Sequence, residues 1–169
     1  MWSERDEDMI ILIESIVLCL LFTIMVSLMS KNPLATLYNY PPKIQERVKS
    51  LKIYKNKIPT TENKIFIKTL ASVFIVIIIS LILRFVNGYT TFREGFGYGL
   101  LLWTIVNIYD VLIIDICWFC QNPKFVFKGT EDMLNEYHNY WFHIKESLKG
   151  EVIALVVCTL VGFIIQYIL

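Results

Sequence analysis

Charged residues are scarce in this sequence. Asp, Glu, Lys and Arg make up 18% of its 169 residues, whereas soluble domains carry about 25%. Hydrophobic residues make up 56%, above the usual ~45–50%, and the mean hydropathy is +0.55. This balance excludes an ordinary soluble domain and is typical of a membrane protein.

Cysteine pairs in exposed loops are also absent. The four cysteines lie within or at the end of long apolar runs, at Cys19, Cys117, Cys120 and Cys158, and this excludes the disulfide framework of a small secreted protein. Cys117 and Cys120 form a CWFC motif that could act as a redox pair, but no second pair of loop cysteines is available to relay electrons. We expect most of these residues to be buried thiols.

Four apolar runs are each long enough to cross a bilayer, and they cover residues 9–29, 66–86, 98–120 and 151–169. About 20 residues at ~1.5 Å each span the hydrocarbon core, and lipid offers the backbone no hydrogen-bond partners, so each run should be an α-helix. No small-residue cleavage motif follows the first run, which we expect to be retained. The sequence therefore predicts an all-α, polytopic integral membrane protein, a four-helix bundle forming one membrane domain over residues 1–169.

Lys and Arg are distributed unevenly between the two sides of these runs. Residues 30–65 hold eight of them and residues 121–150 hold four, while the opposite side has only Arg5 and Arg93. Loops rich in Lys and Arg stay in the cytoplasm. We therefore expect a multi-pass protein of the cell membrane with both long loops cytoplasmic and both termini outside.

The first loop predicts a short amphipathic helix. Pro42 suits a first helical turn, and Ile44, Val48 and Leu51 recur at helical spacing. The rest of the surface carries cations that include Lys43, Arg47 and Lys52. Such a helix can lie on anionic lipid at the cytoplasmic face; the alternative is that these cations only set the topology.

The second loop predicts another amphipathic helix, from Glu131 to Leu148, along the inner membrane surface. Thr130 is a suitable N-cap, and Gly150 follows the expected end. Aromatic residues on its apolar side favour the level of the lipid head groups; they include Tyr137, Tyr140 and Trp141.

Acidic residues within the third apolar run are the first candidate site. An acid at the helix centre costs about 2.5–3.5 kcal/mol, and no Lys or Arg of the four runs lies at the depth of Asp110. This residue must be protonated, solvated in a cavity, or bound to a guest. The α-helical period places Asn107 on the same face and turns Asp115 away from it. The alternative is a neutral Asp110 that holds helices together through Asn107 and a Ser or Thr.

Depth along the helices also suggests two ion pairs. We expect Glu14 to pair with Arg84 near the outer face, and Asp115 to pair with Lys68 near the inner face.

The second candidate site is a polar stripe on the predicted helix of the second loop. Helical spacing gives two neighbouring rows: one has Asp132, Glu136, Asn139 and His143, and the other has Glu131, Asn135 and His138. Histidine transfers protons near neutral pH. A divalent metal ion is a further option, with Asp115, Glu131, His138 and His143 as candidate ligands, although the HExxH pattern is absent. The alternative is a solvated face of a surface helix.

Two classes of function follow from these residues. A small membrane enzyme acting on a lipid or isoprenoid head group would use His138 or His143 as a general base and Asp115 or Glu136 to orient it. Cations would attract an anionic substrate, namely Lys43, Arg47 and Lys52. The alternative is a transporter or channel component, or an accessory subunit, that uses Asp110 and Asn107 as an intramembrane polar site. Either class is compatible with a homo-oligomer or a larger membrane complex; we expect no nucleic-acid partner.

Overall fold

The computed structural model describes the backbone of residues 4–55, 57–58 and 61–169, and the side chains of residues 8–55, 57–58 and 73–169. Within these ranges the chain contains helices and no strand. The all-helical prediction is therefore confirmed for the described residues.

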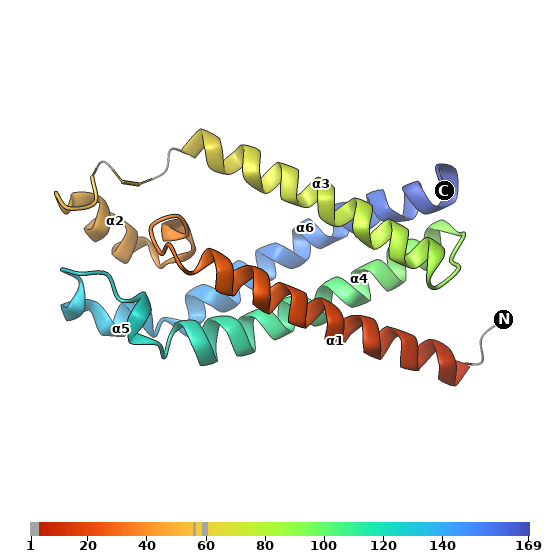
Figure 1. Cartoon of the computed structure of the whole chain (residues 1–169), viewed down its shortest axis with the longest axis horizontal. Coiled ribbons are helices and arrows are strands. Elements are labelled where there is room, and N and C mark those ends of the chain that lie inside the picture. Colours follow the sequence, from red (N-terminus) through yellow and green to blue (C-terminus); the bar gives the residue numbers. More distant parts are fainter. Residues whose placement is uncertain (1–3, 56, 59–60) are drawn as a thin grey trace.

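Four long helices dominate the fold: α1 (Glu4–Met29), α3 (Thr61–Phe85), α4 (Phe92–Tyr109) and α6 (Tyr140–Tyr167). The α4 helix continues directly into a π-helix, η2 (Asp110–Phe119). Five short elements complete the chain: η1 (Leu37–Asn39), α2 (Pro42–Ser50), η3 (Pro123–Phe125), η4 (Glu131–Met133) and α5 (Leu134–Tyr137). The start of α1 and the C-terminus lie at one end of the long axis, and α2 and α5 lie at the other (Figure 1).

Three of the long helices are apolar enough to cross a membrane among the described residues. They cover Asp8–Met29, Phe92–Phe119 and Tyr140–Tyr167, and Val73–Phe85 is a shorter apolar helix. The side chains of residues 66–72, which begin the second predicted span, lie outside the described ones. By length and apolar composition, these helices are compatible with a membrane protein.

Two glycines allow α4 and α6 to pack closely. A Cβ on Gly95 would lie 3.1 Å from the Cα of Gly162, and a Cβ on Gly162 would lie 2.9 Å from the carbonyl oxygen of Phe92. Small residues permit this approach of two backbones in a membrane. The main core lies beside this contact and consists of Val76, Ile79, Leu83, Tyr89, Leu102, Val157, Val161 and Ile165.

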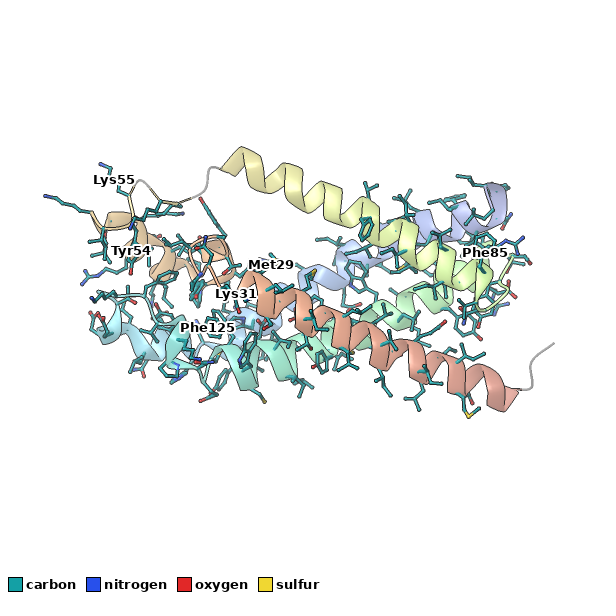
Figure 2. All side chains as sticks on the ribbon, viewed as in Figure 1. Met29, Lys31, Tyr54, Lys55, Phe85 and Phe125 are labelled. Atoms are coloured by element: carbon teal, nitrogen blue, oxygen red, sulfur yellow. The ribbon has the colours of Figure 1, made fainter. Side chains whose placement is uncertain are left out.

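A second core fills the end of the molecule that carries α2 and α5. We call it the aromatic cluster; its buried members are Leu37, Tyr40, Ile44, Val48, Phe125, Phe127 and Tyr137. Figure 2 shows Phe125 and Tyr54 at this end and Phe85 at the opposite one. The hydroxyl of Tyr40 donates to the carbonyl oxygen of Phe125 at 3.2 Å, and burial beside Tyr137 raises the pKa of Tyr40 above its ordinary value.

The short helix of the first loop forms at Pro42–Ser50, but its apolar side does not face a lipid surface. Ile44 and Val48 are both 0% exposed because they pack into the aromatic cluster. The prediction that this side lies on the leaflet is therefore wrong. The cations on its other side stay exposed, and Lys43 forms an ion pair with Glu136.

The second predicted surface helix, Glu131–Leu148, is not one helix. The chain forms η4 and α5, breaks at His138 and Asn139, and restarts as α6 at Tyr140. The Asn139 side chain caps the new helix by accepting from the backbone N–H of Phe142 at 3.2 Å, a position that Asn favours over a helix interior. Residues 140–148 are consequently the first turns of the last long helix, and the two predicted rows do not exist as continuous rows.

Candidate functional site

Asp115 and His143 meet where η2 packs against α6. The carboxylate Oδ2 of Asp115 lies 3.0 Å from Nδ1 of His143. The histidine is only 3% exposed, and its Nε2 atom is buried without a hydrogen-bond partner among the described residues. A buried ring nitrogen without a partner is unusual, and it marks this histidine as a candidate acid or base.

A cavity of about 360 Å³ adjoins this pair, between α1, η2 and α6. Its polar lining residues include Asn107, Asp110, Asp115, His143 and Glu146. A cavity of this size is in the range of sites for small molecules or lipid head groups. The candidates of the third apolar run and one of the two histidines are therefore gathered around one space.

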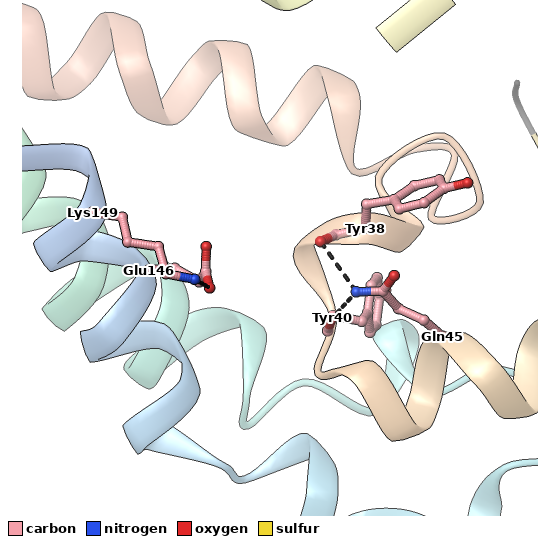
Figure 3. A network of polar contacts seen from close by, with 5 residues as sticks. All are labelled: Tyr38, Tyr40, Gln45, Glu146 and Lys149. Carbon is pink, nitrogen blue, oxygen red and sulfur yellow. Dashed lines mark hydrogen bonds and ion pairs between the residues drawn. The ribbon is translucent and has the colours of Figure 1, made fainter. Parts of the chain in front are cut away.

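Thr36, Tyr38 and Asn39 also line the cavity. Figure 3 shows the Tyr38–Tyr40 segment on one side and the pair of Glu146 and Lys149, on α6, on the other. The side chain of Gln45 holds this segment by donating to the carbonyl oxygens of Tyr38 and Tyr40, at 3.4 and 2.7 Å. The loop that lines the cavity is thus fixed from α2.

The π-helix explains why Asp110 and Asp115 line the same cavity. In an α-helix, residues five apart are separated by about 140° around the axis, and on that basis Asp115 was expected to point away. In a π-helix the bonds run between residues five apart, so that these residues share a face. The backbone N–H of Cys120 accordingly donates to the carbonyl oxygen of Asp115 at 2.9 Å. The expectation that Asp115 faces away from Asp110 is therefore wrong.

Asn107 belongs to a separate polar network deeper in the helices. Its Nδ2 donates to the carbonyl oxygen of Ser147 at 3.1 Å and to the carboxylate of Glu151. The hydroxyl of Thr104 donates to the other oxygen of Glu151 at 3.0 Å. Sequence reasoning missed Glu151 because it stands at the expected edge of a span, where an acid raises no question. Asp110, in contrast, forms no hydrogen bond or ion pair with any described residue.

The other predicted site residues lie away from the cavity lining. Glu136 is paired with Lys43, Arg47 donates from Nε to the carbonyl oxygen of Gly129 at 3.4 Å, and Glu131 accepts from the N–H of Gly129 at 2.8 Å. His138 and Lys52 are exposed. The structure thus brings Asp115 and His143 together, but it does not bring Glu136 and His138 to them.

No group of three His, Cys, Asp or Glu side chains in the described ranges is arranged to hold a metal ion. Asp115 and His143 adjoin each other, while Glu131 and His138 belong to the segment before α6. The four candidate ligands are therefore not assembled around one point.

The two ion pairs expected from depth have different outcomes. Glu14 accepts from Nδ2 of Asn87 at 3.3 Å, and Arg84 donates from Nε to the carbonyl oxygen of Leu169 at 3.1 Å, so these two residues do not pair with each other. The side chain of Lys68 lies outside the described ones, so its pairing with Asp115 stays a prediction; Asp115 contacts His143.

Comparisons of the chain with protein-family models, with characterised proteins and with solved structures find no match. The fold and the site define an all-helical protein with three helices long and apolar enough to cross a membrane and a cavity with polar and aromatic walls, among the described residues.

Proposed function

We propose that the chain is a four-span integral membrane protein in which His143 acts as a general base on the head group of a lipid or isoprenoid. The α3 helix supplies the fourth span. The twelve cations of residues 30–65 and 121–150 favour a cytoplasmic position for the end that carries α2 and α5, with both termini outside. The cavity then opens within the cytoplasmic half of the membrane domain.

The observation that carries this proposal is the contact between Asp115 and Nδ1 of His143. A carboxylate that accepts the Nδ1–H of a histidine fixes the ring and its tautomer, and the lone pair of Nε2 is then free to take a proton. The contact of 3.0 Å has the right length. Nε2 forms no hydrogen bond of standard geometry with a described residue, and the thiol of Cys120 is the other polar group that interacts with the ring. Asp115 therefore serves as the residue that orients the base.

An amphiphilic substrate fits the walls of the cavity. One wall comes from α1 and includes Phe22, Val26 and Met29, while the outer side chains of α1 are large, apolar and exposed. A molecule with an acyl or isoprenoid chain can keep that chain against such a surface while its head group occupies the polar interior. A water-soluble substrate would gain nothing from this arrangement.

The test measures lipid conversion by the full chain in nanodiscs. The discs contain a polar lipid extract with added farnesol and polyprenyl phosphate, and mass spectrometry follows their composition. We expect the wild type to change the composition, and His143→Gln and Asp115→Asn to slow this change by about a hundredfold or more, the usual contribution of a general base. His138→Gln is the matched control because it alters the exposed histidine. A wild type that converts nothing, or a His143→Gln variant as active as the wild type, would refute the proposal.

A second candidate is a non-enzymatic role, as a transporter or channel component or an accessory subunit. The observation in its favour is that Asp110 lines the cavity beside Asn107 without a hydrogen-bond or ion-pair partner among the described residues. A path through four helices would require an oligomer. The variants distinguish this role from the enzyme. If Asp110→Asn abolishes the activity of the protein in the membrane while His143→Gln and His138→Gln both keep it in full, the non-enzymatic role is favoured.

A further inference from the structure

Acidic residues dominate the ionisable lining of the cavity. Three of them line it, Asp110, Asp115 and Glu146, together with His143 and Tyr38, and no Lys or Arg of the described residues does. Asp115 is occupied by His143, and Glu146 forms an ion pair with Lys149. Asp110 is the acid that forms no direct ion pair with a described residue, and its one favourable charge interaction in the cavity is with His143. A ligand with a positive group would supply a counterion, whereas a phosphate would meet three carboxylates.

Aromatic rings line the same space. They belong to Phe22, Tyr38, Trp118, Phe119, Phe125 and Phe142. The face of an aromatic ring attracts a cation, and indole attracts it most strongly. One of these rings already holds a cation, because Nζ of Lys49 lies 4.6 Å from the centroid of Tyr38. The rings thus favour the same sign of charge that Asp110 favours.

The buried Nε2 of His143 adds a hydrogen-bond requirement. When Nδ1 carries the proton, Nε2 is an acceptor. It forms no hydrogen bond of standard geometry with a described residue, and the weak thiol donor of Cys120 is the other polar group that interacts with the ring. An ammonium group with N–H bonds can donate both to this atom and to the carboxylate of Asp110. A quaternary ammonium group can satisfy the charge and the rings but not this acceptor.

We infer that the cavity binds the primary ammonium head group of an amine-bearing amphiphile, between Asp110, Nε2 of His143 and the ring of Trp118. This inference rests on the proposed function, since it names the head group that the general base would meet. It also replaces the expectation of an anionic substrate, because Lys43, Arg47 and Lys52 do not line the cavity.

The experiment measures equilibrium binding of radiolabelled dodecylamine to the full chain in dodecyl maltoside micelles at neutral pH. Dodecanol, dodecyl phosphate and dodecyltrimethylammonium serve as competitors with the same chain. We expect saturable binding of one dodecylamine per protein, and at least about tenfold weaker competition by the alcohol and the phosphate, the ratio expected for one good charge interaction. Dodecyltrimethylammonium should compete at an intermediate level. Equal or stronger competition by dodecyl phosphate would overturn the inference.

Variants locate the binding site. Asp110→Asn and Trp118→Leu should each weaken dodecylamine binding by about tenfold, and Asp132→Asn, which removes an exposed acid away from the cavity, should leave it unchanged. Unchanged binding in both cavity variants would overturn the inference. Because Trp118→Leu keeps every charge, weaker binding in this variant does not come from loss of an acid.

Two further comparisons distinguish the ligand source and the proposed function. Butylamine has the same head group without the long chain, and we expect it to bind far more weakly than dodecylamine. If butylamine binds with the same affinity as dodecylamine, the assignment to an amphiphile is overturned. If dodecylamine fails to bind while His143→Gln still abolishes lipid conversion, the inference is wrong and the proposed function stands. If it binds with the predicted specificity while no lipid is converted, the enzyme proposal alone fails.

Discussion

The carboxylate of Asp115 lies 3.0 Å from Nδ1 of His143, although the two residues belong to different helices. Asp115 is part of the π-helix η2, and His143 stands in the first turn of α6 after the cap at Asn139. Two departures from a regular α-helix therefore assemble the pair: the change of helix type at Asp110 and the break before Tyr140. A π-helix inside a longer helix is frequent at functional sites, and here it borders the cavity.

The tautomer of His143 gives a direct test of this contact. If Asp115 accepts the Nδ1–H bond, Nδ1 of His143 carries a proton in the wild type. Asp115→Asn removes the charged acceptor, so a mixture of tautomers should appear. The chain has only two histidines, so ¹⁵N-histidine labelling with a His138→Gln variant assigns the signals in a long-range ¹H–¹⁵N spectrum. A wild-type His143 protonated only on Nε2 would contradict the contact.

The close packing of α4 and α6 predicts that two glycine substitutions differ in their effect on stability. A Cβ on Gly162 would lie 2.8 Å from Cδ2 of Phe92 and 2.9 Å from its carbonyl oxygen, and the backbone atom cannot move aside cheaply. Gly162→Ala should lower the free energy of unfolding in mixed micelles by about 1–3 kcal/mol. Gly99→Ala is the control, because its nearest neighbour, Sγ of Cys158, would lie at an ordinary 3.6 Å. A larger loss in Gly99→Ala than in Gly162→Ala would contradict the packing.

Residue patterns predicted the long helices well and the site only in part. Uninterrupted apolar runs identify α1, α4 and α6 because backbone groups in lipid must be bonded within a helix, and Pro42 with Ile44 and Val48 identifies α2. The π-helix was missed because nothing local in Asp110–Phe119 distinguishes bonds between residues five apart from α-helical bonds. The break before Tyr140 was missed because the apolar spacing continues across it, and only the capping side chain of Asn139 signals the new start.

The partner of α2 could not be predicted from its own residues. An apolar stripe on a short basic helix fits lipid and protein equally well, and the structure places protein there, since Ile44 is 0% exposed. Ile44→Ala should therefore lower the free energy of unfolding by about 2–5 kcal/mol. Lys43→Gln should cost less than about 1 kcal/mol, because Lys43 is 71% exposed and its ion pair with Glu136 is screened by solvent. Chemical denaturation compares the two variants, and an Ile44→Ala variant as stable as the wild type would mean that α2 does not pack on the protein.

The proposed orientation predicts which positions a membrane-impermeant maleimide can reach. In a background without the four native cysteines, Arg93→Cys should react on intact cells, and Lys52→Cys should react only after the cells are permeabilised. Both residues are exposed, so a difference in labelling reports the side of the membrane rather than burial. Arg93 stands in the first turn of α4, and Lys52 follows α2. The start of α4 and the α2 helix lie at opposite ends of the molecule (Figure 1). Labelling of Lys52→Cys on intact cells, with protection of Arg93→Cys, would invert the proposed topology. Labelling of both on intact cells would mean that α3 does not cross the membrane, because it is the only long helix of the described chain between the two positions.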